Sequence, residues 1–196
     1  MTGSIAPIQF PKRLLMGPGP SEVDPRVYRA MAQPVIGHMD PLFLKCLEEL
    51  QQMLRDAFRT RNTVTFPIAG TGSAGMEAAL MNFLEPGDTA AVIVGGVFAG
   101  RMCEMAERCG ARVIRIENPW GTAADPDRVR QALRGQPVKL LAAVHSETST
   151  GVCQPLEPLR QIAREAGALL VVDAVSSLGG LPLEVDGWGV DVCYSG

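Results

Sequence analysis

The sequence predicts an α/β domain in which a mostly parallel sheet lies between two layers of helices. Two observations lead to this fold class. From about residue 64 onward, short apolar and β-branched runs alternate with amphipathic helical stretches. Several of the short runs are apolar throughout, as expected for strands that are covered on both faces. A chain of 196 residues is long enough to give such a three-layer domain its own core.

The predicted elements follow in order along the chain. Residues 1–20 are expected to form an N-terminal arm, and residues 21–196 a large but incomplete domain. A first helix is predicted by apolar residues on one face, namely Leu47, Leu50, Leu54 and Phe58. The predicted strands are 64–68, 90–94, 112–116, 138–144, 168–172 and 190–194. Four further helices are predicted. The first has Met76, Ala79, Leu80 and Phe83 on one face, the second covers 98–109, the third begins at Asp125 and Pro126, and the fourth covers 155–166.

Composition and charge argue against several classes of protein. A net charge of −3 offers no basic surface to a nucleic acid. No apolar run approaches the roughly 20 residues of a membrane-spanning helix, and the N-terminal segment lacks the apolar core of a secretory signal. The five cysteines are odd in number and form no C-x-x-C pair, which disfavours disulfides and a zinc site. We therefore expect a cytoplasmic protein with no metal site and with neither a nucleic acid nor a membrane as partner.

The first candidate site is a glycine-rich loop, residues 70–75, between a predicted strand and a predicted helix. Its sequence is Gly-Thr-Gly-Ser-Ala-Gly. Backbone N–H groups at a helix N-terminus, together with small hydroxyl side chains, form a cradle for phosphate. The loop also matches the G-x-G-x-x-G pattern of dinucleotide-binding folds, but the next strand ends in Gly95-Gly96 without the acidic residue that holds a ribose. A phosphate site and a purely structural turn both remain open.

Two further polar loops follow predicted strands. Asp173 ends an apolar strand and is followed by Ser176 and Ser177, which also suit the capping of a turn. Residues 145–151, His-Ser-Glu-Thr-Ser-Thr-Gly, follow another apolar strand and also suit a solvated connection. Ligands of open α/β sheets bind at the carboxyl ends of the strands. Because all three loops are expected at that edge, their convergence predicts a ligand site there.

Several motifs, read together, resemble one known family. They are Leu-Met-Gly-Pro-Gly-Pro-Ser at 15–21, Pro-Val-Ile-Gly-His at 34–38, the Gly-Thr-Gly loop, Glu-Pro-Gly-Asp at 85–88, Glu-Thr-Ser-Thr-Gly-Val at 147–152, Val-Asp-Ala-Val-Ser-Ser-Leu-Gly-Gly at 172–180 and the final Tyr-Ser-Gly. The chain resembles the class V aminotransferases of the pyridoxal 5′-phosphate (PLP) fold type I superfamily, near the alanine–glyoxylate and serine–glyoxylate aminotransferases. The resemblance implies the large domain of that fold, without its C-terminal small domain.

The resemblance implies a role for each of several residues. Thr71, Gly72 and Ser73 match the loop that binds the 5′-phosphate of PLP, with Ser73 at a position where histidine is the commonest residue in some relatives. Phe98 matches the aromatic residue that stacks on the pyridine ring, where tryptophan is frequent. Thr148 matches the hydroxyl that hydrogen-bonds the 3′-oxygen of the ring.

Three more matches concern the ring nitrogen and the substrate. Asp173 matches the catalytic carboxylate that pairs with the ring nitrogen, and Val175 packs against the other ring face. Gly19, Gly37 and His38 resemble positions that border the substrate pocket. The resemblance further implies a homodimer that acts on small amino acids and 2-oxo acids.

The expected activity is a ping-pong transfer of an amino group from alanine or serine to glyoxylate, through a lysine Schiff base with PLP. The pattern places that lysine three residues beyond Gly196, and the chain's own lysines, Lys12, Lys45 and Lys139, do not resemble it. Other class V enzymes, namely a phosphonate aminotransferase or a cysteine desulfurase-like lyase, remain alternatives. Phe98 disfavours a desulfurase, which usually has histidine there. A non-catalytic α/β scaffold and a nucleotide-binding domain also remain open.

Overall fold

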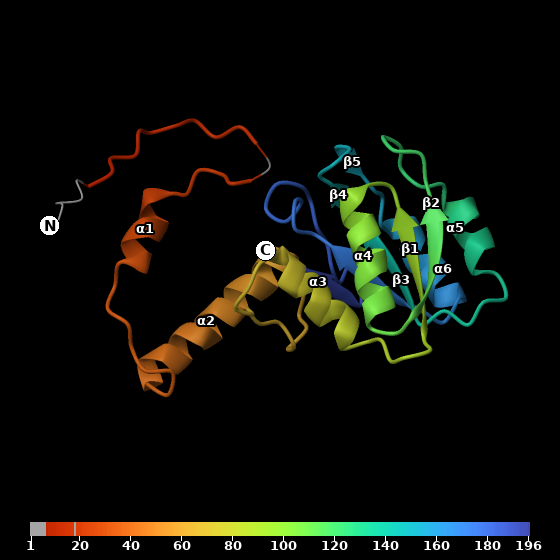
Figure 1. Ribbon diagram of the computed structural model, residues 1–196. Helices are drawn as coiled ribbons and strands as arrows, with labels where there is room; N and C mark the ends of the chain where they lie inside the picture. Colours follow the sequence, from red (N-terminus) through yellow and green to blue (C-terminus); the bar gives the residue numbers. More distant parts are fainter. Residues whose placement is uncertain (1–6, 18) are drawn as a thin grey trace, which may run out of the picture. The chain divides into compact units, whose positions relative to one another are not determined.

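The computed structural model describes residues 7–17 and 19–196 (Figure 1). The chain divides into two compact units, Met1–Gly37 and His38–Gly196. The first unit contains helix α1 (Pro25–Met31), which begins where the Asp24 carboxylate accepts a hydrogen bond from the Arg26 N–H. The second unit contains every strand of the described chain.

Helix α2 (Pro41–Phe58) opens the second unit and confirms the first predicted helix. Asp40 caps it by accepting a 2.8 Å hydrogen bond from the Leu42 N–H, with proline at the first helical position. The four predicted inner residues are all half-buried, whereas most of the helix is exposed. Its carboxyl end is tied down by a hydrogen bond from the Val185 N–H to the Phe58 carbonyl. No helix in the described residues has the length and apolar character needed to span a bilayer.

The centre of the second unit is a five-stranded sheet in which every neighbouring pair is parallel. Its strands are β1 (Thr89–Val94), β2 (Arg112–Glu117), β3 (Leu140–Val144), β6 (Leu169–Asp173) and β7 (Val192–Tyr194), in the order β2-β1-β3-β6-β7. The predicted parallel sheet is therefore confirmed. Two short antiparallel strands, β4 (Ser146–Glu147) and β5 (Val152–Cys153), lie beside it and were not predicted.

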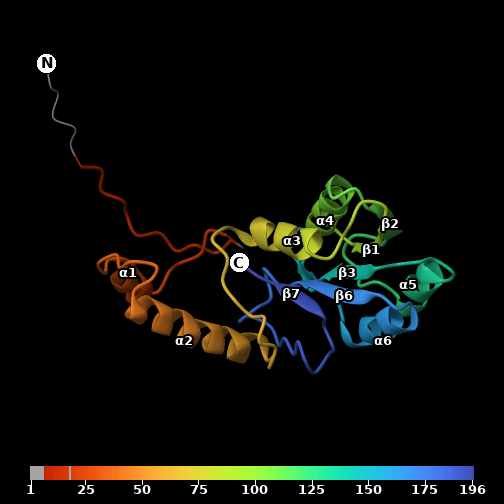
Figure 2. The ribbon, with the colours of Figure 1, turned by 90° about the horizontal axis from the view of Figure 1, so that it is seen from below.

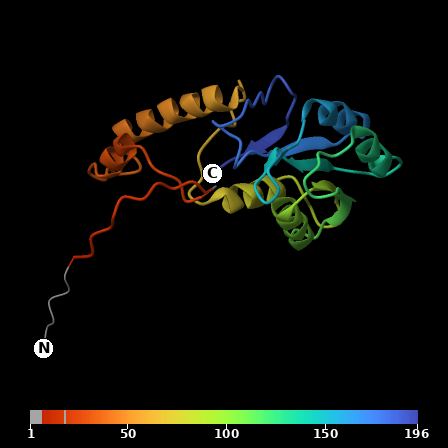
Figure 3. The same cartoon turned by 90° about the horizontal axis from the view of Figure 1, so that it is seen from above.

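Two helices cover each face of the sheet. The helices are α3 (Gly72–Met81), α4 (Val97–Arg108), α5 (Pro126–Leu133) and α6 (Glu157–Glu165). Figures 2 and 3 show α3 and α4 on one side of the sheet and α5 and α6 on the other. Each side has its own apolar cluster, one centred on Leu80, Met102 and Leu140 and the other on Leu141, Leu159 and Leu170. Both clusters use the strands' fully buried residues, as continuous apolar strands require.

Two expectations about the elements were wrong. Residues 64–68 form no strand, and Val64, Phe66 and Ile68 are exposed. Their β-branched and aromatic composition favours a strand, but a strand needs a neighbour for its backbone N–H and C=O groups. No strand in the described chain supplies one. The second difference is smaller: α3 ends at Met81, so Phe83 lies beyond the helix and is partly exposed.

Candidate active site

The candidate site lies at the carboxyl edge of the sheet, where the strand order changes direction. The chain passes from β1 outward to β2 and then returns to β3 on the other side of β1. In open α/β sheets a ligand binds at such a reversal, outside the carboxyl ends of the strands. Phe98 follows β1, Thr148 follows β3 and β4, and Asp173 ends β6. The structure thus brings three of the predicted residues to the ends of adjacent strands.

Asp173 is a buried carboxylate, 3% exposed, on the face of the sheet that carries α3 and α4. Its Oδ1 accepts a 2.9 Å hydrogen bond from the Val175 N–H, and its Oδ2 accepts a 2.8 Å bond from the Tyr194 hydroxyl. Burial raises the pKa of Asp173, while these two hydrogen bonds act to lower it and the nearby Glu147 raises it further. Its side-chain partners within the described residues are neutral. A cation placed here would relieve the cost of burying this charge.

Tyr194 is the partner of Asp173 that the sequence reasoning missed. Asp173 and Tyr194 are opposite one another in the parallel register of β6 and β7. Both side chains therefore lie on the same face, and both are buried. Burial, and after it the charge of Asp173 and the hydrogen bond to Asp173, raises the pKa of Tyr194. The hydroxyl therefore stays protonated and donates a hydrogen bond to Asp173. The available signal was that Asp173 and Tyr194 stand at the carboxyl ends of two predicted strands that are consecutive in the sequence. The sequence did not show that these two strands pair in the sheet.

The amino end of α3 lies next to Val175. Thr71 is the N-cap, and its carbonyl accepts hydrogen bonds from the Ala74 and Gly75 N–H groups, while its side chain makes no capping bond. A Cβ on Gly72 would approach the Val175 Cγ2 to 2.7 Å, so only glycine fits between them. In the described chain the N–H groups of Gly72 and Ser73 have no hydrogen-bond partner. This helix end can therefore accept an anion.

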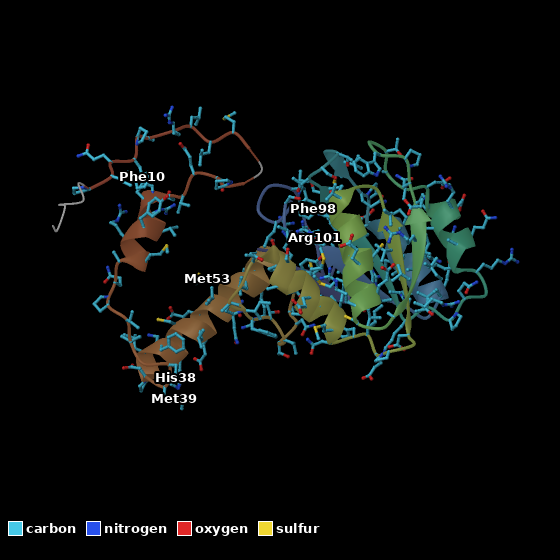
Figure 4. The ribbon with its side chains drawn as sticks, viewed as in Figure 1. Phe10, His38, Met39, Met53, Phe98 and Arg101 are labelled. Atoms are coloured by element: carbon cyan, nitrogen blue, oxygen red, sulfur yellow. The ribbon has the colours of Figure 1, made fainter. Side chains whose placement is uncertain are left out.

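Arg101 connects Ser73 to Phe98 and was not singled out from the sequence. One Arg101 nitrogen donates a 3.2 Å hydrogen bond to the Ser73 Oγ. The guanidinium carbon lies 5.1 Å from the centre of the Phe98 ring, a cation–π distance, and Figure 4 shows the two side chains together at the start of α4. The residues predicted for the phosphate and for the ring face are thereby in one contact network.

The amino end of α4, unlike that of α3, is already occupied. Glu147 is 4% exposed, and its carboxylate accepts hydrogen bonds from the Phe98 N–H at 3.3 Å and the Ala99 N–H at 3.1 Å. The Ser149 hydroxyl accepts a 2.9 Å bond from the Val97 N–H and donates a 2.7 Å bond to Glu147. Both residues belong to the predicted loop after β3, but no role was assigned to either. Nothing in the local sequence indicated a contact across about fifty residues.

Hydroxyl groups join the loop after β3 to the loop after β6. Thr148 donates a 3.0 Å hydrogen bond to the Ser176 Oγ. Beneath them, the His145 Nδ1 lies 2.9 Å from the Ser177 Oγ, and both of these residues are buried. Burial lowers the pKa of His145, so its ring is neutral near neutral pH. Thr148 is therefore held at the sheet edge by contacts to the same loop that carries Val175.

The three predicted substrate-pocket residues lie in the N-terminal part of the chain. Gly19 and Gly37 belong to the first unit, and no atom lies within 4 Å of a Cβ built on either. His38 is exposed in the turn before α2 (Figure 4). That these residues border the substrate pocket stays a prediction.

Neither of the two lysines in the second unit lies at the candidate site. Lys139 pairs with Asp88 at 2.6 Å, at the amino ends of the strands, and Lys45 pairs with Glu49 on α2. Lys12 is exposed in the first unit. Among the residues that the structure describes, no group of three or more His, Cys, Asp or Glu side chains is placed to hold a metal ion.

Comparison with known proteins identifies the family. The sequence model of aminotransferase class-V matches residues 20–196. The chain is 42% identical to the (S)-ureidoglycine–glyoxylate transaminase of Bacillus subtilis, over 95% of this chain and 45% of that protein. It is also 42% identical to the alanine–glyoxylate aminotransferase of Rattus norvegicus, over 97% of this chain and 46% of that protein.

A solved structure shows the same similarity. The alanine–glyoxylate aminotransferase from Nostoc sp. superposes with a TM-score of 0.94 at 46% identity, covering 97% of this chain and 51% of that one. The chain thus spans about half the length of the relatives it matches. The matched length, the identity and the shared fold agree, and the chain belongs to the class V aminotransferase family.

Proposed function

We propose that the protein containing this chain is a PLP-dependent aminotransferase that transfers an amino group from a small amino acid, alanine or serine, to glyoxylate. The observation that carries the proposal is the buried Asp173, whose one described side-chain partner, Tyr194, is neutral, and whose neighbour Val175 abuts the open amino end of α3. Relatives named for glyoxylate support the acceptor. The named donors differ among these relatives, so the donor is the less supported part.

The residues present fit PLP. The open amino end of α3, with Thr71, Gly72 and Ser73, would hold the phosphate by N–H and hydroxyl groups. Asp173 would face the ring nitrogen, because a buried carboxylate with a raised pKa is stabilised by a nearby positive charge. Phe98 would lie on one ring face.

The remaining contacts of the ring follow from the same arrangement. Val175 abuts the phosphate-binding loop through Gly72 and would lie on the second ring face. The Thr148 hydroxyl, held by Ser176, would bind the ring oxygen. When bound, PLP supplies an electron sink for the substrate carbanion.

The chain's own residues would then perform two tasks. Asp173 would keep the proton on the ring nitrogen, which strengthens electron withdrawal by the ring. Tyr194 would keep Asp173 ionised and oriented, since a donated hydrogen bond favours the charged carboxylate. The apolar faces of Phe98 and Val175 would exclude water from the ring. The proposal also requires a lysine that holds the cofactor, and we take it to be a lysine other than Lys12, Lys45 and Lys139.

The proposal is tested on the full-length protein with added PLP. We expect an absorbance band near the visible edge, fixed to one lysine by borohydride, and consumption of glyoxylate with alanine or serine. The Asp173→Asn variant should fold and bind PLP but lose at least about a hundredfold in turnover, as is common when a charge that acts on the reacting group is removed. Absence of the lysine-linked cofactor in the wild-type protein would favour a non-catalytic scaffold.

A second donor is favoured by one comparison. The Bacillus subtilis relative is named for (S)-ureidoglycine, and its similarity to this chain equals that of the rat alanine enzyme. A donor panel of alanine, serine and ureidoglycine, with glyoxylate as the common acceptor, distinguishes them by kcat/KM. If none of the three transfers nitrogen to glyoxylate, the proposed donors are wrong even where PLP is bound.

Assembly and location are also part of the proposal. A homodimer is expected from the resemblance to the family, and its test is the mass in solution of the full-length protein. A cytoplasmic location is suggested by five free cysteines, two of them exposed. Fractionation of cells that express the protein would test it.

A further inference from the structure

The two helices on one face of the sheet, α3 and α4, present their amino ends at the carboxyl edge, and they differ in what occupies those ends. The amino end of α3 has no side-chain cap. The amino end of α4 is closed by Glu147, which reaches it from β4. A carboxylate at a helix amino end is stabilised by the helix dipole and by the N–H groups that have no partner inside the helix.

The Glu147 carboxylate makes contacts with both of its oxygens. Oε1 accepts from the Phe98 N–H, the Ser149 N–H and the Ser149 hydroxyl, and Oε2 accepts from the Ala99 N–H. Ser149 in turn accepts from the Val97 N–H. All of the first three N–H groups of α4 therefore bond to this pair of side chains.

The close approach depends on a glycine. A Cβ on Gly96 would overlap the side chains of Glu147 and Ser149. Glycine at this N-cap therefore permits the carboxylate to reach the helix, and its own lack of a side chain leaves that end for Glu147. Glu147 on β4 therefore holds the first turn of α4 in place, and Gly96 leaves the space for it; this contact is the joint between β4 and α4.

Phe98 lies directly at this joint. Its own N–H group is bonded by Glu147, so the backbone from which the ring projects is held by that carboxylate. The Phe98 ring and Arg101, one turn later, sit on the same helix end, and Arg101 reaches Ser73 on α3. Any rotation or fraying of the first turn of α4 would move the ring and its contact to the phosphate-binding loop together.

We propose that Glu147 is a positioning residue for the cofactor: it fixes the first turn of α4, and with it the Phe98 ring, and it fills the helix end that would otherwise compete with α3 for the phosphate. This inference rests on the proposed function, because it takes PLP as the group that Phe98 faces. Glu147 touches neither the cofactor nor the substrate in this scheme. It acts through Phe98 and through the choice of anion site.

The test compares Glu147→Gln with Glu104→Gln in the full-length protein. Glutamine keeps the size of the side chain but loses the charge and one of its two acceptors. Glu104 is exposed on the same helix, and within the described residues no hydrogen bond or ion pair involves it, so its variant removes the same charge without touching the joint. For each protein we would measure the PLP dissociation constant by spectral titration, the circular dichroism of the bound-cofactor band, and amide exchange in peptides containing Val97 to Ala99.

In Glu147→Gln we expect PLP to bind roughly three- to tenfold more weakly, from the loss of a buried charged cap. The circular dichroism per bound cofactor should change, because the ring face is no longer fixed, and exchange at the start of α4 should become faster. Glu104→Gln should match the wild type in all three. Ser149→Ala should move the same signals in the same direction by less.

The inference is overturned if Glu147→Gln loses thermal stability while the affinity and dichroism of the cofactor stay at wild-type values, since that is a purely structural cap. If Glu147→Gln fails to fold, Ser149→Ala and Glu147→Asp decide the question by the same readouts. A wild-type protein that takes up no PLP would refute the proposed function, and this inference with it. Normal uptake by the wild type together with an unchanged Glu147→Gln variant would refute this inference alone.

Discussion

Replacement of Tyr194 by phenylalanine tests the electrostatics of the site without changing its shape. The change removes only the hydroxyl that donates a 2.8 Å hydrogen bond to Asp173. Both residues are buried, at 7% and 3% exposed, so water cannot easily replace the lost donor. A hydrogen bond to a charged group contributes about 1.5–3 kcal/mol to stability, and we expect the cofactor-free protein to lose about that much.

The loss should depend on pH in a defined direction. Burial raises the pKa of Asp173 above its ordinary value of 3.8, so the cofactor-free protein loses stability as pH rises through the pKa of the folded state. The Tyr194 hydrogen bond lowers that pKa, and the phenylalanine variant should therefore have a higher one. Its deficit is largest where Asp173 is ionised and shrinks as pH falls and the carboxyl is protonated in both proteins.

The assay is urea unfolding of the cofactor-free, full-length protein at several values between about pH 4 and pH 8. Tyr28→Phe is the matched control, because Tyr28 is the only other tyrosine and is 59% exposed on α1. The reasoning is refuted if Tyr194→Phe costs no more than the control. A deficit that does not grow with pH would show that the hydroxyl does not act on a charged Asp173.

Three further predictions address the neighbouring contacts. Replacing Arg101 by methionine should weaken PLP binding about two- to fivefold, because a cation–π contact with Phe98 contributes roughly 0.5–1 kcal/mol, and an unchanged titration would contradict it. Leu159→Ala should lower the unfolding free energy by about 2–5 kcal/mol, since Leu159 is fully buried on the inner face of α6, and the cofactor spectrum of the folded variant should stay the same. Gly96→Ala should displace Glu147 and reproduce the cofactor dichroism of Glu147→Gln; a wild-type spectrum would show that the joint tolerates a Cβ.

The predictable part of the fold was the part in which local pattern and tertiary environment agree. The predicted strands 90–94 and 168–172 are apolar throughout, and 138–144 is apolar except for Lys139, as expected for strands covered on both faces. The structure confirms all three with boundaries shifted by at most two residues. The helix that begins after Asp125 was predicted from an equally local signal, since its capping residue and its proline act within one turn. The segment 64–68 failed because strand propensity needs a partner, which is a tertiary property.

The candidate site shows the same division. The sequence by itself determined the residue types, namely the glycine loop at 70–75, the carboxylate at Asp173 and the polar loop at 145–151, because each follows from local pattern. Their convergence was expected because ligands of open α/β sheets bind at the carboxyl ends of the strands. Only the tertiary structure decided that Tyr194 donates to Asp173 and that Glu147 closes α4, because these contacts depend on strand register and on side chains 21 and 48 or more residues apart. Pattern along a chain reports short-range geometry, whereas hydrogen bonds across a sheet depend on which strands become neighbours.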